Sequence, residues 1–283
     1  VALNTDSMDG DVNLLILADY DATINGEGFP ILFKGTIPGS GIYSLKVAPA
    51  VGVTTAEIGG TWTAALVRVD SIKKLTFENF TIRSKGIGSV SNGAMYITNG
   101  AQFLNFKNMK FKAGGQGSNY QVVFMNGSNT ATGGVKDWTF DGCEFTDNGE
   151  AFPEVGFNMR GYTIDPTTRG MIKNCKIYNF NGVGTFTGSG LNVQYAVTYI
   201  TIQDNEIYST IPAGSVIAGY RGMSLGSTTS GPTTNFTITG NYIHDLTSTV
   251  ATTSCYAMSL SCNITAGIQM ADFLIDNNHI ANI

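Results

Sequence analysis

The chain has 283 residues, of which 13% are charged, and it contains 35 glycines and carries a formal net charge of −5. This length suits one large elongated domain, because each unit of a repeat protein contacts only its neighbours. The acidic balance provides no basic stripe for phosphate groups and therefore excludes nucleic acid as an expected partner.

Residues 1–60 contain apolar stretches that predict a first coil and an N-terminal cap. The longest apolar run, from Leu14 to Ala18, has the length of a strand and not the roughly 20 residues of a membrane-spanning helix. The chain begins at Val1 without a charged and apolar leader, as it would after removal of a signal peptide or excision of a domain. With the low charge, this favours a secreted or cell-surface protein.

The same N-terminal segment holds the one candidate for a metal. Asp19 and Asp21, followed by Asn25-Gly26-Glu27, offer some of the oxygen ligands of a calcium loop. The spacing of an EF-hand and its closing glutamate are missing. The leading expectation is therefore no metal and no cofactor, with calcium at Asp19 and Asp21 as the weaker alternative.

One short phrase recurs along residues 61–283. It reads as a strand with alternating apolar positions, a two-residue polar kink and a second short strand. The apolar residue before each kink recurs every 29 to 37 residues, at Phe77, Phe106, Phe140, Ile172, Ile202, Ile238 and Ile275. A second apolar phrase precedes each copy, such as MYI at 95–97 and MSL at 223–225. These segments predict three short strands per repeat.

The repeated phrase resembles the coils of the pectate-lyase-like superfamily, and specifically bacterial extracellular repeat proteins. The resemblance covers about residues 61–283 and implies an all-β, single-stranded, right-handed parallel β-helix. About seven coils are clear, and residues 1–60 add a cap and first coil. The superfamily includes lyases, hydrolases, phage fibres and adhesins, so the resemblance specifies fold far better than function.

Stacked coils place equivalent residues above one another at about 4.8 Å. The first residue after the kink gives the column Phe80, Met109, Cys143, Cys175, Asn205, Asn241 and Asn278. Its last members look like the inward asparagine ladder of this superfamily. Two residues later, an apolar column from Ile82 to Ile280 predicts core.

Four cysteines are too few for a disulfide-built fold and lack the paired spacing of a zinc site. Cys143 and Cys175 stack in successive coils, within the range of a disulfide, although buried free thiols are favoured. Cys255 and Cys262 bracket a short strand, and a disulfide there is as well supported as two free thiols. Neither Cys255 nor Cys262 has a basic neighbour in sequence that would activate its thiol.

The outward residues of the first strand of each coil form a candidate binding face. They are predicted to be Arg68, Tyr96, Val123, Asn158, Asn192, Ser224 and Ser259, with Arg160 and Arg221 nearby. Asn, Ser and Arg can bond sugar hydroxyls while Tyr96 stacks on a ring; the competing interpretation is a solvated strand face. His244 and His279 are expected to be exposed polar side chains.

Catalysis is the less favoured reading of that face. No two carboxylates occupy equivalent positions of adjacent coils, as glycoside hydrolysis would need. A polyuronate lyase needs cations and a base, for which Arg160 and Arg221 are weak candidates, two coils apart. No catalytic residue is assigned on this basis.

The sequence thus favours a non-catalytic extracellular module with a structural, adhesive or filament-forming role and the capacity to bind glycans. Its expected partners are extracellular polysaccharide or further copies of itself stacked end to end. The alternative is a polysaccharide lyase or another carbohydrate-active enzyme that uses the first-strand face.

Overall fold

The structure is a computed structural model, and it describes residues 8–17, 28–36, 39, 41–61, 64–85, 93–114, 120–128, 130, 132–162, 164–181, 187–209, 219–227, 231–247, 254–262 and 270–283. These residues form 25 strands in three parallel sheets and contain no helix. Asp19 and Asp21 lie outside the described residues. No described helix has the length and apolar character needed to cross a membrane.

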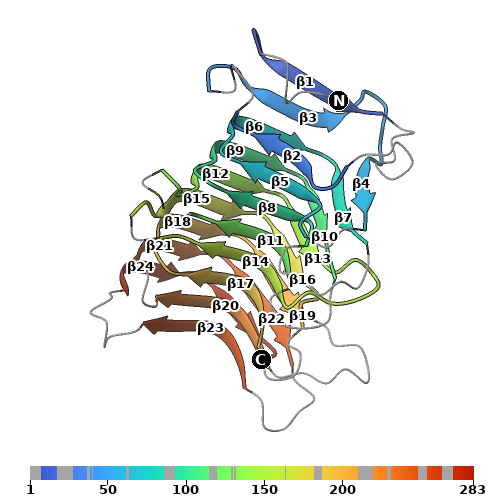
Figure 1. The fold of residues 1–283 in the computed structure, drawn as a ribbon. Coiled ribbons are helices and arrows are strands. Elements are labelled where there is room, and N and C mark those ends of the chain that lie inside the picture. The colour runs from blue at the N-terminus through green and yellow to red at the C-terminus, as the bar shows by residue number, and fades with distance from the viewer. Residues whose placement is uncertain are drawn as a thin grey trace.

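Sheet A runs the length of the molecule (Figure 1). Its described strands follow the order β1-β3-β6-β9-β12-β15-β18-β21-β24. Their bounds are Val12–Ile16, Leu45–Pro49, Lys73–Glu78, Gln102–Lys107, Lys136–Asp141, Thr167–Lys173, Val197–Gln203, Thr233–Thr239 and Met270–Asp276.

Sheets B and C complete the triangular cross-section. Sheet B has the order β2-β5-β8-β11-β14-β17-β20-β23, with bounds Ile31–Lys34, Val67–Asp70, Met95–Thr98, Gln121–Asn126, Val155–Arg160, Gly188–Gln194, Tyr220–Ser227 and Cys255–Cys262. Sheet C has the order β4-β7-β10-β13-β16-β19-β22-β25, with bounds Glu57–Gly60, Thr81–Ser84, Lys110–Lys112, Glu144–Thr146, Lys176–Tyr178, Glu206–Ser209, Tyr242–Leu246 and His279–Ala281.

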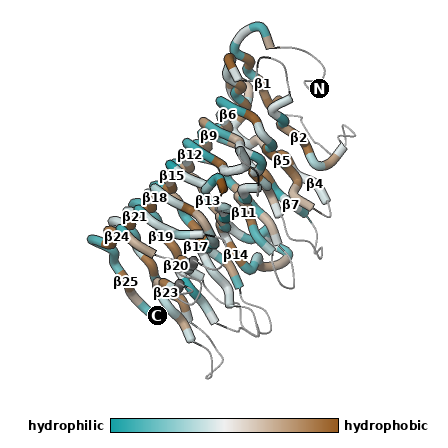
Figure 2. Tube along the Cα trace, turned by 60° about the vertical axis from the view of Figure 1, so that its left-hand side comes forward, coloured by the Kyte–Doolittle hydropathy of each residue, from teal (hydrophilic) through white to brown (hydrophobic). Residues whose placement is uncertain are grey.

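From β3 onward the chain visits sheets A, C and B in turn and then returns to A one level further along. Each return is a crossover between parallel strands, for which the right-handed path is strongly preferred. The chain is therefore a right-handed parallel β-helix with three strands per coil, and the fold class predicted from the repeat is confirmed. Figure 2 shows the coils stacked along one axis, with hydrophobic and hydrophilic residues alternating along the strands.

The polar kink between sheets A and C has a simple conformational cause. Its first residue has positive φ in every coil from β6 onward, at Asn79, Asn108, Gly142, Asn174, Asp204, Gly240 and Asn277, with φ between 49° and 67°. Asn, Asp and Gly are the residues that enter this left-handed region at least cost. The two-residue turn thus aims the next side chain inward and starts the strand of sheet C.

The core consists of the predicted columns. The column from Phe77 to Ile238 in sheet A and the column from Ile82 to Ile243 in sheet C are fully buried. Phe106 and Phe140 stack with ring centroids 4.4 Å apart, and Phe111 and Phe145 at 5.3 Å. In the last coil, Ile275 and Ile280 are 43% and 53% exposed.

Residues 1–60 already contribute to all three sheets. Strands β1 and β3 pair in parallel in sheet A, β2 pairs with β5 in sheet B, and β4 pairs with β7 in sheet C. Strand β1 lies at one end of the stack and β25 at the other (Figure 2). A boundary near residue 60 between the cap and the helix stays a prediction.

Candidate functional site

The bend between sheets A and C holds a buried hydrogen-bonded ladder. Asn205 Nδ2 donates to Asn241 Oδ1 at 2.9 Å, and Asn241 Nδ2 donates to Asn278 Oδ1 at 2.8 Å. Each amide also donates to a main-chain carbonyl of the preceding coil, as Asn241 does to Ile202 at 2.9 Å. The ladder continues where the Cys175 N–H donates to Asn205 Oδ1 at 2.9 Å. These bonds satisfy polar groups that the turn would otherwise bury unpaired.

Cys143 and Cys175 extend the ladder as buried free thiols. The Cys143 N–H donates to Cys175 Sγ at 3.3 Å, so a sulfur atom takes the place of an amide oxygen. Burial, together with the neighbouring Cys143, raises the pKa of the Cys175 thiol well above its usual value. Because the thiolate is the reactive form, this position suits packing and not chemistry. Cys255 is a half-buried free thiol.

The outer face of sheet B brings the predicted glycan-facing residues into one column. Register aligns Arg68, Tyr96, Phe124, Asn158, Asn192, Ser224 and Ser259. The prediction of Val123 in this column was wrong. Val123 pairs with Met95 and is fully buried, because the second apolar phrase of that coil, VVF, starts one position earlier than assumed.

The N-terminal half of this face is occupied by a stack of rings and guanidinium groups. Tyr96 and Phe124 stack at 5.4 Å, and Arg68 lies 5.6 Å from the Tyr96 ring centre. Arg160 lies 5.5 Å from Phe124 and 4.9 Å from Tyr195, within cation–π range of both rings.

Arg160 is further held by Gln194. Its Nε and a terminal nitrogen donate to Gln194 Oε1 at 3.2 and 2.6 Å. The Arg160 guanidinium group thus contacts two rings and one side-chain amide of the protein, and these contacts give it a structural role. Arg221, the other weak candidate for catalysis, has a different environment.

Arg221 lies in an open groove of about 340 Å³ over β17 and β20. Among the predicted residues, Asn192 and Ser224 line the same groove. Other lining groups include Glu154, Thr187 and Tyr195. One terminal nitrogen of Arg221 donates to Ser224 Oγ at 3.4 Å, a long bond that leaves most of its donors available. The groove therefore combines one guanidinium, one carboxylate, two primary amides, hydroxyls and an aromatic ring.

Buried polar atoms without hydrogen-bond partners gather on the outer face of sheet B. Among the described residues they include Arg68 Nε, Gln121 Oε1, Asn126 Oδ1, Asn158 Oδ1 and Arg221 Nε. A buried polar atom without a partner costs about 1–3 kcal/mol, so such a cluster calls for an explanation. Ordered water or a bound polar ligand would supply the missing partners.

Tyr195, which lines the groove of Arg221, has an unusual backbone conformation. Its φ is 65°, in the left-handed region that bulky residues avoid. Strained residues of this kind persist where the surrounding structure requires them and gather at functional sites. Sequence reasoning missed Tyr195, Phe124 and Glu154. Tyr195 directly follows the strand phrase LNVQ, and only the register of the stacked coils shows that it faces the groove.

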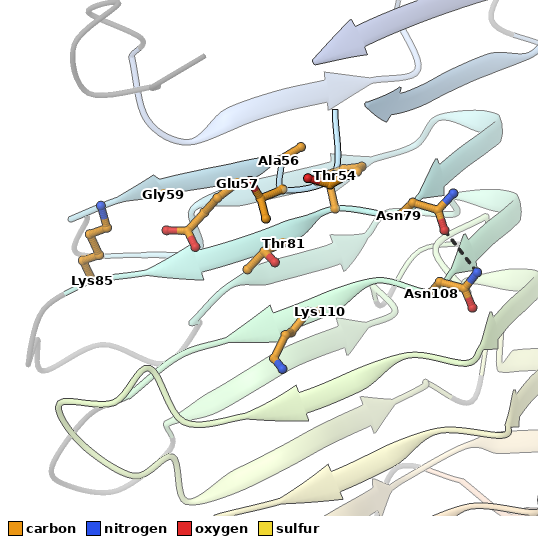
Figure 3. A pocket seen from close by; sticks show the side chains of 11 residues that line it. Thr54, Ala56, Glu57, Gly59, Asn79, Thr81, Lys85, Asn108 and Lys110 are labelled. Atoms are coloured by element: carbon orange, nitrogen blue, oxygen red, sulfur yellow. Dashed lines mark hydrogen bonds between the residues drawn. The ribbon is translucent and has the colours of Figure 1, made fainter. Parts of the chain in front are cut away.

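A second groove, of about 530 Å³, lies beside the edge strand β4 (Figure 3). Glu57, Lys85 and Lys110 line it, together with the hydrogen-bonded pair Asn79 and Asn108. Lys110 donates to Glu144 at 2.6 Å, and Glu57 lies 3.9 Å from Arg83. Because Lys110 and Glu57 are each paired with a charge outside the lining, this groove is a weaker candidate than the groove on sheet B.

His244 was expected to be exposed, and this was wrong. Its side chain is 12% exposed, since the ring stacks between Tyr208 and Tyr242 at 5.0 and 4.1 Å. Its nitrogens lie 2.8 Å from Asp245 and 3.3 Å from Glu206. The described residues contain no group of three or more His, Cys, Asp or Glu side chains arranged to hold a metal ion.

No protein-family model matches the chain, and no curated protein sequence does so. Among solved structures, PfbA, a surface adhesin of Streptococcus pneumoniae, is 10% identical with a TM-score of 0.46, covering 96% of this chain and 81% of that one. Pectate lyase Pel9A is 10% identical with a TM-score of 0.41, covering 97% and 80%. ORF18 of Geobacillus virus E2 is 12% identical with a TM-score of 0.42 over 86% of this chain, which spans 48% of that viral chain. Similarities of this size say nothing about what the chain binds.

Proposed function

We propose that the protein is an extracellular or cell-surface β-helix module that binds polysaccharide on the outer face of sheet B. The observation that carries this proposal is the groove over β17 and β20, where Arg221, Asn192, Ser224 and Tyr195 meet. Amide, hydroxyl and guanidinium groups exchange hydrogen bonds with sugar hydroxyls, and an aromatic ring offers an apolar surface to the sugar ring. Parallel coils present these groups on a rigid surface along the solenoid.

The test is binding to a carbohydrate microarray, followed by calorimetry on the polysaccharide that binds. Arg221→Ala should weaken binding roughly tenfold or more, as truncation of a central interface arginine commonly does. Arg221→Lys should recover only part of the affinity, because lysine keeps the charge but not the planar fork. Lys107→Ala removes an exposed cation from sheet A and serves as the control. Binding that survives Arg221→Ala at full strength would contradict the proposal.

A polysaccharide lyase is the second candidate, and one observation favours it. Arg221 and Glu154 line the same groove. The Arg221 guanidinium can neutralise a uronate carboxylate of the substrate, and the Glu154 carboxylate can accept a proton. Release of unsaturated sugar ends from polyuronates, lost in both Arg221→Ala and Glu154→Gln, would establish this activity. Arg160→Ala should lower such activity only through the packing of Phe124 and Tyr195.

End-to-end stacking of copies remains a separate proposal from the sequence. Filaments in electron micrographs of the purified protein, with an axial repeat equal to the solenoid length, would establish it. Short single rods at the same protein concentration would remove it without affecting the groove on sheet B.

A further inference from the structure

The strands of sheet A carry a repeated backbone irregularity. From β6 to β24, the register passes over one residue near the start of each strand. These residues are Lys74, Phe103, Asp137, Arg169, Tyr199, Asn235 and Asp272, with φ between 53° and 59°. They are called the left-handed column below. Because the pairs on either side stay one to one, no strand carries an inserted residue, and the positive φ bends every strand at the same level.

The residues of the left-handed column do not all suit its conformation. Asn235 and Asp272 belong to the types that tolerate positive φ, and they show that such residues fit here. Lys74, Phe103, Arg169 and Tyr199 do not belong to those types, and each costs about 1–2 kcal/mol relative to a tolerant residue. Since the fold does not require bulky side chains at these positions, their presence calls for a reason outside folding.

These bulky side chains are exposed. Phe103 is 52% exposed and Tyr199 is 61% exposed. Between them in the column, Arg169 donates to both carboxylate oxygens of Asp137 at 2.6 and 2.7 Å. Phe103 and Tyr199 are three coils apart, which is about 14 Å at the usual strand spacing. Two exposed rings therefore flank a fixed ion pair along the solenoid axis.

A groove of about 470 Å³ lies over this part of sheet A. Tyr199, Arg169 and Asp137 line it from the left-handed column, and Thr139, Met171 and Thr201 line it from the next outward column. The lining charges compensate each other. Along the neighbouring edge of the sheet, Lys173 pairs with Asp141 at 3.1 Å. The groove thus favours a ligand without net charge.

The pairing of the strands beneath the groove excludes one class of ligand, an added peptide strand. Strands β12, β15 and β18 are each paired on both sides within sheet A. Their main-chain groups are therefore not available to pair with an added peptide strand. A ligand must bind through rings, hydroxyls and the ion pair, which are groups that suit a polyhydroxylated ring.

We infer that the left-handed column from Phe103 to Tyr199 is a second binding site, for a neutral polysaccharide chain lying along the solenoid axis. Sugar rings stack on Tyr199 and Phe103, and their hydroxyls bond to Asp137, Arg169 and the threonines. This site lies on a different sheet from the groove of Arg221 and does not depend on it.

The test is affinity electrophoresis in native gels that contain hydroxyethylcellulose, xyloglucan, galactomannan or dextran. We expect retardation by at least one of these neutral polymers. Tyr199→Asn should weaken it roughly two- to tenfold, as expected for one aromatic contact, and Phe103→Asn/Tyr199→Asn should abolish it. Loss of retardation in Arg221→Ala would instead assign the neutral polymer to the groove on sheet B and overturn the inference.

Asparagine is the informative replacement because it fits the backbone, as Asn235 does in the same column. Both asparagine variants should keep or raise the midpoint of thermal unfolding, while retardation is weakened in the single variant and lost in the double variant. A purely structural role for the rings would instead lower the midpoint. Absence of retardation by all four polymers, or retardation that persists in the double variant, would overturn the inference.

Discussion

At the scale of single residues, a ladder asparagine forms several hydrogen bonds through one side-chain amide. Asn241 is fully buried and bonds to both neighbouring coils through one amide group. It accepts from the Asn205 N–H at 3.1 Å and donates to the Ile202 carbonyl at 2.9 Å. A shorter side chain would leave these partners buried and unsatisfied.

We therefore expect Asn241→Ala to lower the free energy of unfolding by about 3 kcal/mol, since it leaves more than one buried group without a partner. Denaturation in urea, followed by circular dichroism, measures this loss. Asn105→Ala, on the half-buried outer face of sheet A, is the matched control and should change stability by less than about 0.5 kcal/mol. Equal losses in the two variants would show that the ladder adds nothing specific.

At the scale of elements, the outer surface of sheet C alternates in charge from coil to coil. Lys110 lies 2.6 Å from Glu144, and Lys176 lies 2.8 Å from Glu206. Hydrogen bonding from Lys176, together with His244, holds the pKa of Glu206 below its usual value of 4.5. On sheet A, hydrogen bonding from Arg169 likewise holds the pKa of Asp137 below 3.8.

These lowered pKa values predict sensitivity to acid. The folded protein binds fewer protons at these carboxyls than the unfolded chain, so they contribute stability above their unfolded pKa values and lose it as pH falls through the folded ones. The free energy of unfolding should be steady near neutral pH and decline below about pH 4.5. Urea denaturation across this range measures it. Glu206→Gln should flatten the decline, and an unchanged slope in that variant would argue against the pair.

At the scale of the whole molecule, stability depends on stacking between neighbouring coils. Phe140 is fully buried at the centre of the stack and packs against rings from its own coil and from the coil before it, including Phe106 and Phe145. Trp138 of the same coil fits because Gly170 lies beneath it; a Cβ there would come within 2.0 Å of the indole. Aromatic rings of neighbouring coils therefore pack closely at the centre of the solenoid.

Phe140→Ala should cost about 3–5 kcal/mol, as expected for truncating a fully buried aromatic side chain. The same change at Phe273, half-buried in the last described coil, should cost less because less surface returns to water. Chemical denaturation compares the two variants. If Phe273→Ala proved as costly as Phe140→Ala, stability would not follow the packing of the coils.

The sequence by itself determined the all-β class, the three strands per coil and the inward columns. Each of these follows from local rules: period-2 alternation fixes which residues face inward, and Asn, Asp or Gly fixes each kink. A pattern from Phe77 to Ile238 repeated in this way leaves little freedom for another fold.

Only the tertiary structure decided which outward residues act together. Tyr195 reaches Arg160 across coils, and Tyr199 joins Arg169 and Asp137, because stacking brings residues about 30 positions apart to within one strand spacing. Loops of unequal length separate these residues in the chain. The alignment of outward residues between successive coils therefore does not follow from composition or spacing. The misplacement of Val123 by one position had a local cause, because the consecutive apolar residues Val122, Val123 and Phe124 do not show by alternation which of them faces inward. Outward side chains carry no inward hydrophobic pattern, and their grouping depends on contacts between coils that the linear sequence does not contain.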